Sequence, residues 1–491
     1  MKRHISLFPV LAASLAGCTV GPDFERPALS PAGGYAAVPP AGKGASAPAP
    51  GDGPAPRWWE AFGSADLDAL VDRAIANNQS LTASNATLAQ ARAHIAAVAG
   101  RRLPQVDANA RVEHEQVNLA AFGLDNLGGG SIANPELELY SVGAGVSYDL
   151  DLFGRNRRAL EQSVAQAEAQ QHQTEAAHLT IAGRVVTQVL TIAAIRERIA
   201  AARALLAEDQ RNVTLTDARR RGGAGTMVEV LSAQGQLAAD QGELPQLDQQ
   251  LAEARNMLAI LLGLSPAELG ATDFDFAGFA MPSDVPLALP SALVHKRPDI
   301  LQAEADLHAA TAAIGVATAR LYPDITLGAT IAQSAAHPED VFARSFRGFD
   351  IFAGLTAPIF HGGTLKAEKR GAEAEARAAA ATYQQTVLEA FGQVSDLLAA
   401  LGNDARSVMT QQQAADIAAR SLHLSRRSFQ VGNSGILQVL DASRIYQRTR
   451  LALVDAQARQ FLNVARLYVA TAGGWTGPAV AAQAEGRTGA P

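Results

Sequence analysis

Cysteine is almost absent from this sequence: Cys18 is the single one among 491 residues. A disulfide framework or a cysteine-ligated metal site within one chain is therefore excluded. Aromatic residues make up only 5%, and much of the 48% hydrophobic share is alanine, which favours helices packed closely side by side. Basic residues are not in excess, since 41 stand against 48 acidic ones for a net charge of −7. No nucleic acid is expected as a partner, because its binders carry a strong basic excess.

Long apolar runs are also missing after residue 17. None approaches the roughly 18 to 20 apolar residues of a membrane-spanning helix, so the sequence predicts that any membrane crossing is made by strands. The chain has no Walker-A loop, GxSxG elbow or GxGxxG strand–turn, and its ten histidines show no HExxH spacing. We therefore expect no enzyme activity, no metal and no soluble cofactor.

The first residues have the order of a secretory signal. Two basic residues precede an apolar stretch over residues 5–16, and small residues lead to Cys18. This order predicts a signal peptide over residues 1–17. The end of the segment, Leu15-Ala16-Gly17-Cys18, resembles the bacterial lipobox, which implies a lipid on Cys18; an ordinary cleavage site that contains a cysteine is the alternative. The resemblance also implies sorting to the outer membrane, because residue 19 is not aspartate.

The segment after Cys18 is poor in apolar residues. Residues 19–57 hold nine prolines and seven glycines, and such a segment cannot bury a core. Residues 18–57 are therefore predicted to form a lipid-anchored linker that carries the folded part away from the anchor. Order is expected to resume at Trp58, and residues 474–491 are predicted to be a tail.

The folded part repeats itself. Residues 78–110 align without gaps on residues 297–329, an offset of 219, and further along Phe153 lies opposite Phe360 as the offset shrinks to about 208. The period is too long for a solenoid, so it indicates a duplicated half-structure. The predicted divisions are a first repeat at 58–263, an equatorial connector at 264–290 and a second repeat at 291–473.

Each repeat contains two runs in which apolar and polar residues alternate strictly, the first of them after Pro104 or Pro323. Period two predicts strands with one apolar face. The predicted strands lie at about residues 104–117, 137–151, 323–333 and 349–360. In the last run the apolar set is Phe349, Ile351, Ala353, Leu355, Ala357 and Ile359.

Long helices are expected after each pair of strands. Residues 155–221 and 364–430 contain no proline, and 67 helical residues span roughly 100 Å. Apolar residues spaced by three and four predict coiled-coil packing. A glycine-containing turn and a returning helix follow, so helical hairpins are predicted at 155–262 and 364–472.

Four strands per chain cannot close a sheet. Small barrels need about eight strands, and strands in lipid must form a closed barrel because an open edge leaves backbone groups unpaired. Several chains would therefore have to share one barrel. The alternative is a soluble pair of β-hairpins packed on helices.

Three motifs carry a family resemblance: Trp58-Trp59-x-x-Phe62, the run from Tyr148 to Arg155, and Arg297-Pro298-Asp299-Ile300. They resemble those of the outer membrane factors, the TolC/OprM/NodT-type efflux lipoproteins, from Cys18 to about Trp475. The resemblance implies an α+β membrane protein that forms a homotrimer. In it, four β-strands per chain build a shared transmembrane β-barrel in outer-membrane lipid, and long coiled-coil helices form a periplasmic α-barrel. It further implies a periplasmic adaptor and an inner-membrane transporter, of RND type, as partners.

Two of these motifs are interpreted as structural. Arg297-Pro298-Asp299 has proline in a helix's first turn with an acid beside it, which is a good helix start. Phe153 and Gly154 belong to the motif that leads from strand to long helix.

Glu229 and Asp441 are the candidate gate residues. Both follow the glycine turn of a helical hairpin, and the resemblance implies that acids there ring the periplasmic entrance; Gln438 stands where relatives carry a second acid. The alternative is that each acid only stabilises a helix start. Arg219, Arg220 and Arg221 are predicted to supply contacts that close the tips.

Two functions follow from these observations. The first is a passive exit duct of a tripartite efflux system. The second is a non-conducting coiled-coil lipoprotein that spaces two membranes. Conductance in a planar bilayer distinguishes them, because a spacer gives none.

Overall fold

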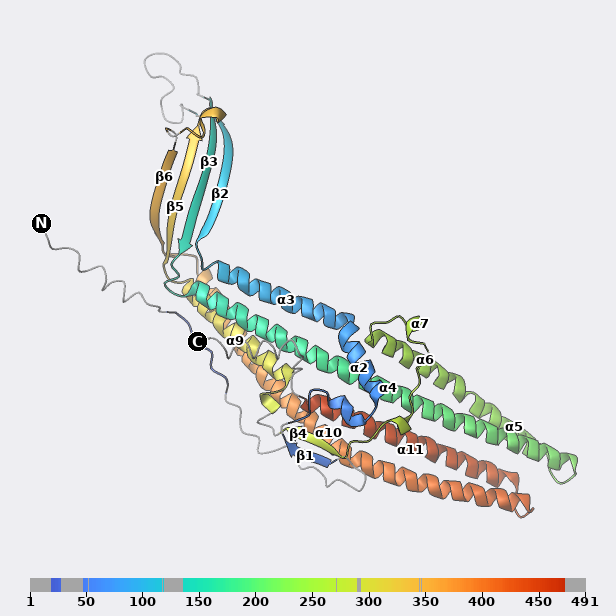
Figure 1. The fold of residues 1–491 in the computed structure, drawn as a ribbon. Helices are drawn as coiled ribbons and strands as arrows, with labels where there is room; N and C mark the ends of the chain where they lie inside the picture. Colours follow the sequence, from blue (N-terminus) through green and yellow to red (C-terminus); the bar gives the residue numbers. More distant parts are fainter. Residues whose placement is uncertain are drawn as a thin grey trace, which may run out of the picture. The chain divides into compact units, whose positions relative to one another are not determined.

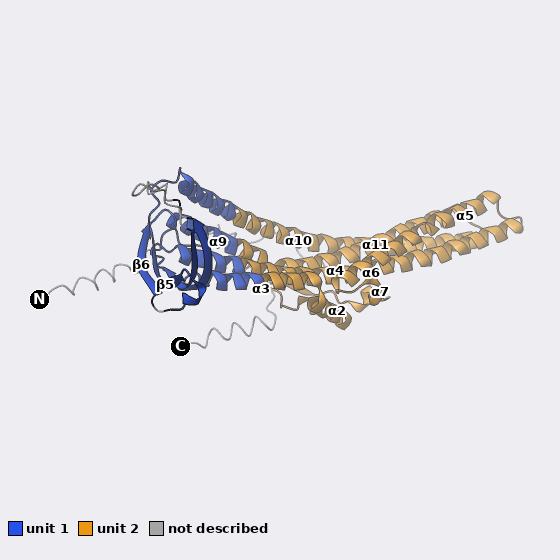
Figure 2. Cartoon of the chain, turned by 90° about the horizontal axis from the view of Figure 1, so that it is seen from above, with its two compact units in different colours: residues 1–27, 89–168, 304–381 blue, residues 28–88, 169–303, 382–491 orange. Residues whose placement is uncertain are grey.

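The computed structural model describes residues 19–27, 47–51, 53–116, 118, 136–270, 272–288, 293–343, 345 and 347–472. The predicted signal peptide at 1–17, Cys18 and the predicted tail at 474–491 lie outside the described residues. The chain divides into two compact units (Figure 2). Unit 1 comprises residues 1–27, 89–168 and 304–381, and unit 2 comprises residues 28–88, 169–303 and 382–491.

Unit 1 contains a four-stranded antiparallel sheet (Figure 1). Its strands are β2 (Gln105–Gln116), β3 (Glu136–Asp149), β5 (Asp324–Ala335) and β6 (Arg347–Thr356), in the spatial order β2-β3-β5-β6. The central pair, β3 with β5, joins the two repeats, with Ala144 opposite Ile331. The predicted α+β fold with four strands is confirmed, although β6 ends at Thr356, so Ala357 and Ile359 lie beyond it.

Four helices cross the boundaries of the units: α3 (Gln79–Gly100), α4 (Arg155–Arg221), α9 (Pro298–Ala319) and α10 (Thr364–Gln430). The duplication is visible in their lengths, since α3 and α9 have 22 residues each and α4 and α10 have 67 each. Arg155 and Thr364 begin the long helices, an offset of 209. Phe153 lies two residues before its long helix and Phe360 lies four residues before the other, so the segments that lead into the two helices differ in length by two residues if these phenylalanines are equivalent.

Unit 2 is mostly helical. The further elements are η1 (Trp58–Phe62), α2 (Ala65–Asn77), α5 (Met227–Gln241), α6 (Glu243–Leu261), α7 (Pro266–Leu269), η3 (Phe276–Gly278) and α11 (Ile436–Thr471); η4 (Pro338–Asp340) belongs to unit 1. The core of unit 2 gathers apolar residues of α4, α6 and α11 around η1. Within it, Trp58 stacks on Tyr468 with ring centroids 5.6 Å apart, and Trp59 and Phe62 are fully buried. The Trp58-Trp59-x-x-Phe62 motif therefore anchors the first helices to α11.

The returning helix of the first repeat is broken, contrary to the single helix expected. It consists of α5 and α6, separated at Gly242. Pro245 has no N–H to donate, and its ring conflicts with the carbonyl of Gln241, so proline is tolerated only in the first turn of a new helix. In the second repeat, where α11 is continuous from Ile436 to Thr471, no proline stands in the helix.

A small parallel sheet was not expected. Strand β1 (Ala47–Gly51), inside the predicted linker, pairs with β4 (Asp284–Ala288), inside the predicted connector. Residues 47–51 of the predicted linker are therefore paired in a sheet. Backbone hydrogen bonding needs no apolar side chains, and this is why a Pro/Gly-rich segment pairs here.

Helix α4 contains an apolar stretch, although no stretch long and apolar enough to span a membrane was expected after residue 17. One 18-residue window in it has a mean hydropathy of 1.4, so length and composition alone would allow it to cross a membrane. However, 61% of that window is buried inside the protein, and Val185, Val189 and Ile192 lie in the core of unit 2. Core packing accounts for these apolar residues.

Candidate functional site

The residues directly after Cys18 pack within unit 1, against the start of α4. The Val20 N–H donates to the carbonyl of Phe153 (3.2 Å). The Arg158 side chain, only 5% exposed, donates to the carbonyls of Val20 and Gly21 and pairs with Asp23 at 2.7 Å. Residues 19–27 of the predicted linker are therefore held in place, because a buried guanidinium on α4 supplies donors that this segment satisfies.

Close backbone contacts extend this packing. Gly21 has φ +98°, and a Cβ there would lie 2.5 Å from the Cα of Gly315 on α9. A Cβ on Gly154 would lie 2.7 Å from the Thr19 side chain. Only glycine permits such approaches. Further along the segment, Phe24 stacks on His308 and Arg26 pairs with Glu304 at 2.6 Å. We call residues 19–27 the N-terminal strap.

The motif from Tyr148 to Arg155 builds the junction between strand β3 and helix α4. Arg155 bridges Asp149 (2.6 Å) and Asp324 (2.9 Å), the residues at which β3 ends and β5 begins. Asp151, at φ +48°, accepts hydrogen bonds from the first N–H groups of α4, which are the groups that a helix leaves unsatisfied. Phe153 stacks on Tyr322 with centroids 4.6 Å apart. These contacts hold the junction between β3 and α4 in place, which is a structural role.

Arg297 connects the start of α9 to its neighbours in unit 2. It pairs with Asp299 (2.7 Å) and donates to the carbonyl of Ala470 in α11 (2.8 Å) and to Gln393 in α10 (3.1 Å). Pro298 is the first residue of α9. Bonds from one planar guanidinium to three elements hold their relative positions.

The two candidate gate acids lie at the starts of the returning helices in unit 2. Glu229 forms a capping box with Thr226: its carboxylate accepts the Thr226 N–H at 2.7 Å. Asp441 is the sixth residue of α11, exposed and paired with Arg444 at 2.7 Å. The sequence thus placed both acids near the hairpin turns, and the structure provides each with a local partner.

Of the three arginines predicted to supply closing contacts at the tips, two pair within their own helix. Arg220 and Arg221 both pair with Asp217 one turn earlier in α4. Arg219 lies over the ring of Phe429 (4.3 Å) and donates to its carbonyl (3.1 Å). Arg219 therefore joins α4 to α10 near the hairpin turns, and this partner was not predicted.

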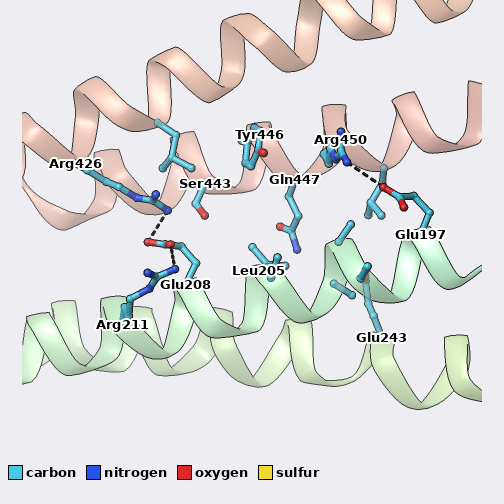
Figure 3. Close-up of a pocket in the computed structure, with 16 residues that line it drawn as sticks. Glu197, Leu205, Glu208, Arg211, Glu243, Arg426, Ser443, Tyr446, Gln447 and Arg450 are labelled. Atoms are coloured by element: carbon cyan, nitrogen blue, oxygen red, sulfur yellow. Dashed lines mark hydrogen bonds and ion pairs between the residues drawn. The ribbon is translucent and has the colours of Figure 1, made fainter. Parts of the chain in front are cut away.

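A groove of about 420 Å³ lies between the two hairpins (Figure 3). Its ion pairs join Glu197 to Arg450 (3.0 Å) and Glu208 to both Arg426 and Arg211 (2.6 Å each). The floor includes alanines of α4 and Leu205. Sequence reasoning missed the pairs of Glu197 with Arg450 and of Glu208 with Arg426, since no local pattern connects residues more than two hundred positions apart. In the part of the chain that the structure describes, no group of three or more His, Cys, Asp or Glu residues is placed to hold a metal ion.

Comparison with known proteins agrees with this architecture. The model of the outer membrane efflux protein family matches residues 70–264 and 289–473. The chain is 30% identical to the pyoverdine export outer membrane protein OpmQ of Pseudomonas putida, over 97% of this chain and 98% of that protein. It is 29% identical to the outer membrane protein OprJ of Pseudomonas aeruginosa (95% of each) and 26% identical to the probable outer membrane lipoprotein SilC of Salmonella typhimurium (94% and 96%).

Solved structures show the same fold. The outer-membrane channel OprN superposes with a TM-score of 0.83 at 27% identity, covering 93% of this chain and all of that one. The chain belongs to the outer membrane efflux protein family. It is an efflux channel of the outer membrane, and members of this family are channels rather than enzymes.

Proposed function

We propose that three copies of this chain form one passive exit duct, and that an inner-membrane transporter drives export through it by way of a periplasmic adaptor. The supporting observation is that, among the described residues, each of the two edge strands of the sheet in unit 1 has no partner strand on its outer side. Strands β2 and β6 lie at the two edges of the sheet, and their apolar side chains are exposed to solvent in the single chain. On β2, Val106 is 73% exposed and Val112 is 69% exposed. On β6, Phe349 is 79% exposed and Ile351 is 77% exposed. Edges in lipid must be paired, and neighbouring copies supply the partner strands.

The need for an external energy source follows from the chemistry of the chain. The sequence has no Walker-A loop with which to bind a nucleotide. Relatives are named as components of export, such as OpmQ for pyoverdine. We therefore assign energy supply and cargo choice to the inner-membrane transporter.

The first test is conductance. Full-length protein purified in detergent and added to a planar lipid bilayer should give discrete single-channel current steps, because a closed barrel encloses an aqueous path. Detergent without protein is the control. Membrane binding without any steps, by protein that is folded by circular dichroism, would favour the spacer function instead.

We also propose that Cys18 carries lipid. Thr19 packs on Gly154, which directly precedes α4 and lies shortly after β3, and Thr19 is the residue that follows Cys18 in the sequence. The strap would thus place acyl chains beside the strands rather than at the end of a free linker. The name of SilC as a probable lipoprotein agrees with this.

Mass spectrometry of the mature N-terminus should show Cys18 with a diacylglyceryl group and an acylated amine. Since no other cysteine exists, Cys18→Ser should abolish labelling by a clickable fatty acid, and it should slow targeting more than it reduces conductance. A mature chain that begins elsewhere, or a bare cysteine, contradicts the proposal.

A further inference from the structure

The four-stranded sheet of unit 1 has one face that is built from polar and small residues. On β5 this face carries Thr326, Gly328 and Thr330, and the register places Ser147 opposite Gly328 and Gly145 opposite Thr330. Strands of a membrane barrel turn their apolar residues to lipid and their polar residues to the interior. In the duct proposed above, this face therefore lines the lumen, and the assignment rests on that proposed function.

Phe352 interrupts the polar face. Among the described residues of β2, β3, β5 and β6, it is the only phenylalanine, tyrosine or tryptophan on that side of the sheet. Phe349 is three residues away on the same strand, so it lies on the opposite, apolar face with Ile351 and Leu355. Contact with lipid explains the aromatic residue of the apolar face, but it does not explain Phe352.

Gly328 determines how the Phe352 ring lies. The two residues are opposite each other in the register of β5 and β6. A Cβ on Gly328 would collide with the Cε1 and Cζ atoms of Phe352, and Gly328 is buried while Thr330 on the same face is exposed. The ring therefore lies across the backbone of β5, a close approach that glycine permits. Because the Phe352 side chain is 46% exposed, one side of the ring covers the strand and the other side stays open.

A carboxylate lies next to this ring. Asp350 is two residues before Phe352 on β6, so it shares the polar face at a distance of about 7 Å along the strand, and it is exposed. Its partner in the register is Thr330, which carries no charge. An open aromatic ring favours stacking with another flat ring and also attracts a cation, while a carboxylate attracts positive charge. Together these two side chains fit a planar aromatic cation.

We propose that Phe352 and Asp350 form a binding site for planar aromatic cations on the lumen wall. The aromatic part of the ligand stacks on the Phe352 ring that lies over Gly328, and its positive charge faces Asp350. A trimer has three such sites at one level of the barrel. They hold these molecules longer inside the duct and leave the choice of cargo to the transporter. The alternative is that the ring only covers Gly328 and so stabilises the sheet.

Binding of N-methylacridinium, a flat cation with a permanent charge, separates these two roles. Its fluorescence anisotropy is measured with full-length protein in detergent. Phe352→Leu still covers Gly328 but has no aromatic ring, so it should raise the dissociation constant about three- to tenfold. Phe349→Leu is the matched control on the opposite face and should change nothing. Equal dissociation constants in wild type and Phe352→Leu would overturn the site. If Phe352→Leu does not fold, Asp350→Asn at an exposed position should raise the constant about twofold or more, and no rise would refute the site.

Reaction of introduced cysteines tests which face lines the lumen. In lipid vesicles, a charged, water-soluble thiol reagent should modify Phe352→Cys and leave Phe349→Cys unreacted, and Cys18 is common to both variants. The reverse pattern would overturn the proposal. Single-channel conductance of the same preparations tests the duct separately. A conducting protein that binds the probe equally well without the Phe352 ring refutes the site alone, whereas folded protein without current steps refutes the duct and with it the site.

Discussion

Cysteines placed at Ala353 on β6 and Val112 on β2 are expected to crosslink neighbouring protomers into a covalent trimer. The register comes from the internal repeat. Within one chain Ala144 of β3 pairs with Ile331 of β5, the second strand of one repeat with the first strand of the other. The hairpin of β2 and β3 has the same register as the hairpin of β5 and β6. Ala353 on β6 therefore takes the position that Ala144 has on β3, and Val112 on β2 takes the position that Ile331 has on β5. The same pairing between chains joins Ala353 to Val112, with Cβ atoms about 4.5 to 5.5 Å apart.

Oxidation in the membrane followed by non-reducing electrophoresis measures this result. The expected outcome is a change from no crosslink in either single-cysteine variant to mainly trimer in the double variant. Ala353→Cys with Ala108→Cys is the matched control, because four residues along a strand displace the thiol by about 13 Å. Equal crosslinking of both pairs, or a ladder that ends at dimer, would contradict the proposed assembly.

Asp441→Asn combined with Glu229→Gln is expected to lower the preference of the channel for cations over anions by about twofold or more. In a trimer these residues would place six carboxylates at the entrance, and a ring of fixed negative charge attracts cations. Each pair of charges interacts by at most a few kcal/mol, about 4 kcal/mol at 4 Å near a protein surface. Gln also satisfies the capping box, so Glu229→Gln removes the charge and keeps the helix start.

Reversal potentials in a salt gradient measure the selectivity. Asp248→Asn on α6, an exposed acid outside the hairpin turns, is the control and should leave selectivity unchanged. If the double variant keeps wild-type selectivity and loses only about 1 kcal/mol per site in the free energy of unfolding, the acids are helix caps and the gate assignment is wrong.

Local patterns in the sequence determined the elements of this protein. Period-two alternation predicted the four strands, and spacings of three and four predicted the paired long helices, because these periods reflect backbone geometry alone. The offset of 219 revealed the duplication. The break at Gly242 was also readable, since Pro245 cannot continue a helix. The Glu229 capping box and the helix start at Pro298 are equally local.

The tertiary structure alone decided which distant residues meet. Glu197 pairs with Arg450 and Arg219 with the backbone of Phe429, and the N-terminal strap lies on Arg158. The physical reason is that such contacts depend on how far each helix is rotated and shifted along its neighbour. Periodicity states which face of a helix is apolar, but the polar residue that lies opposite another is selected only when the helices pack.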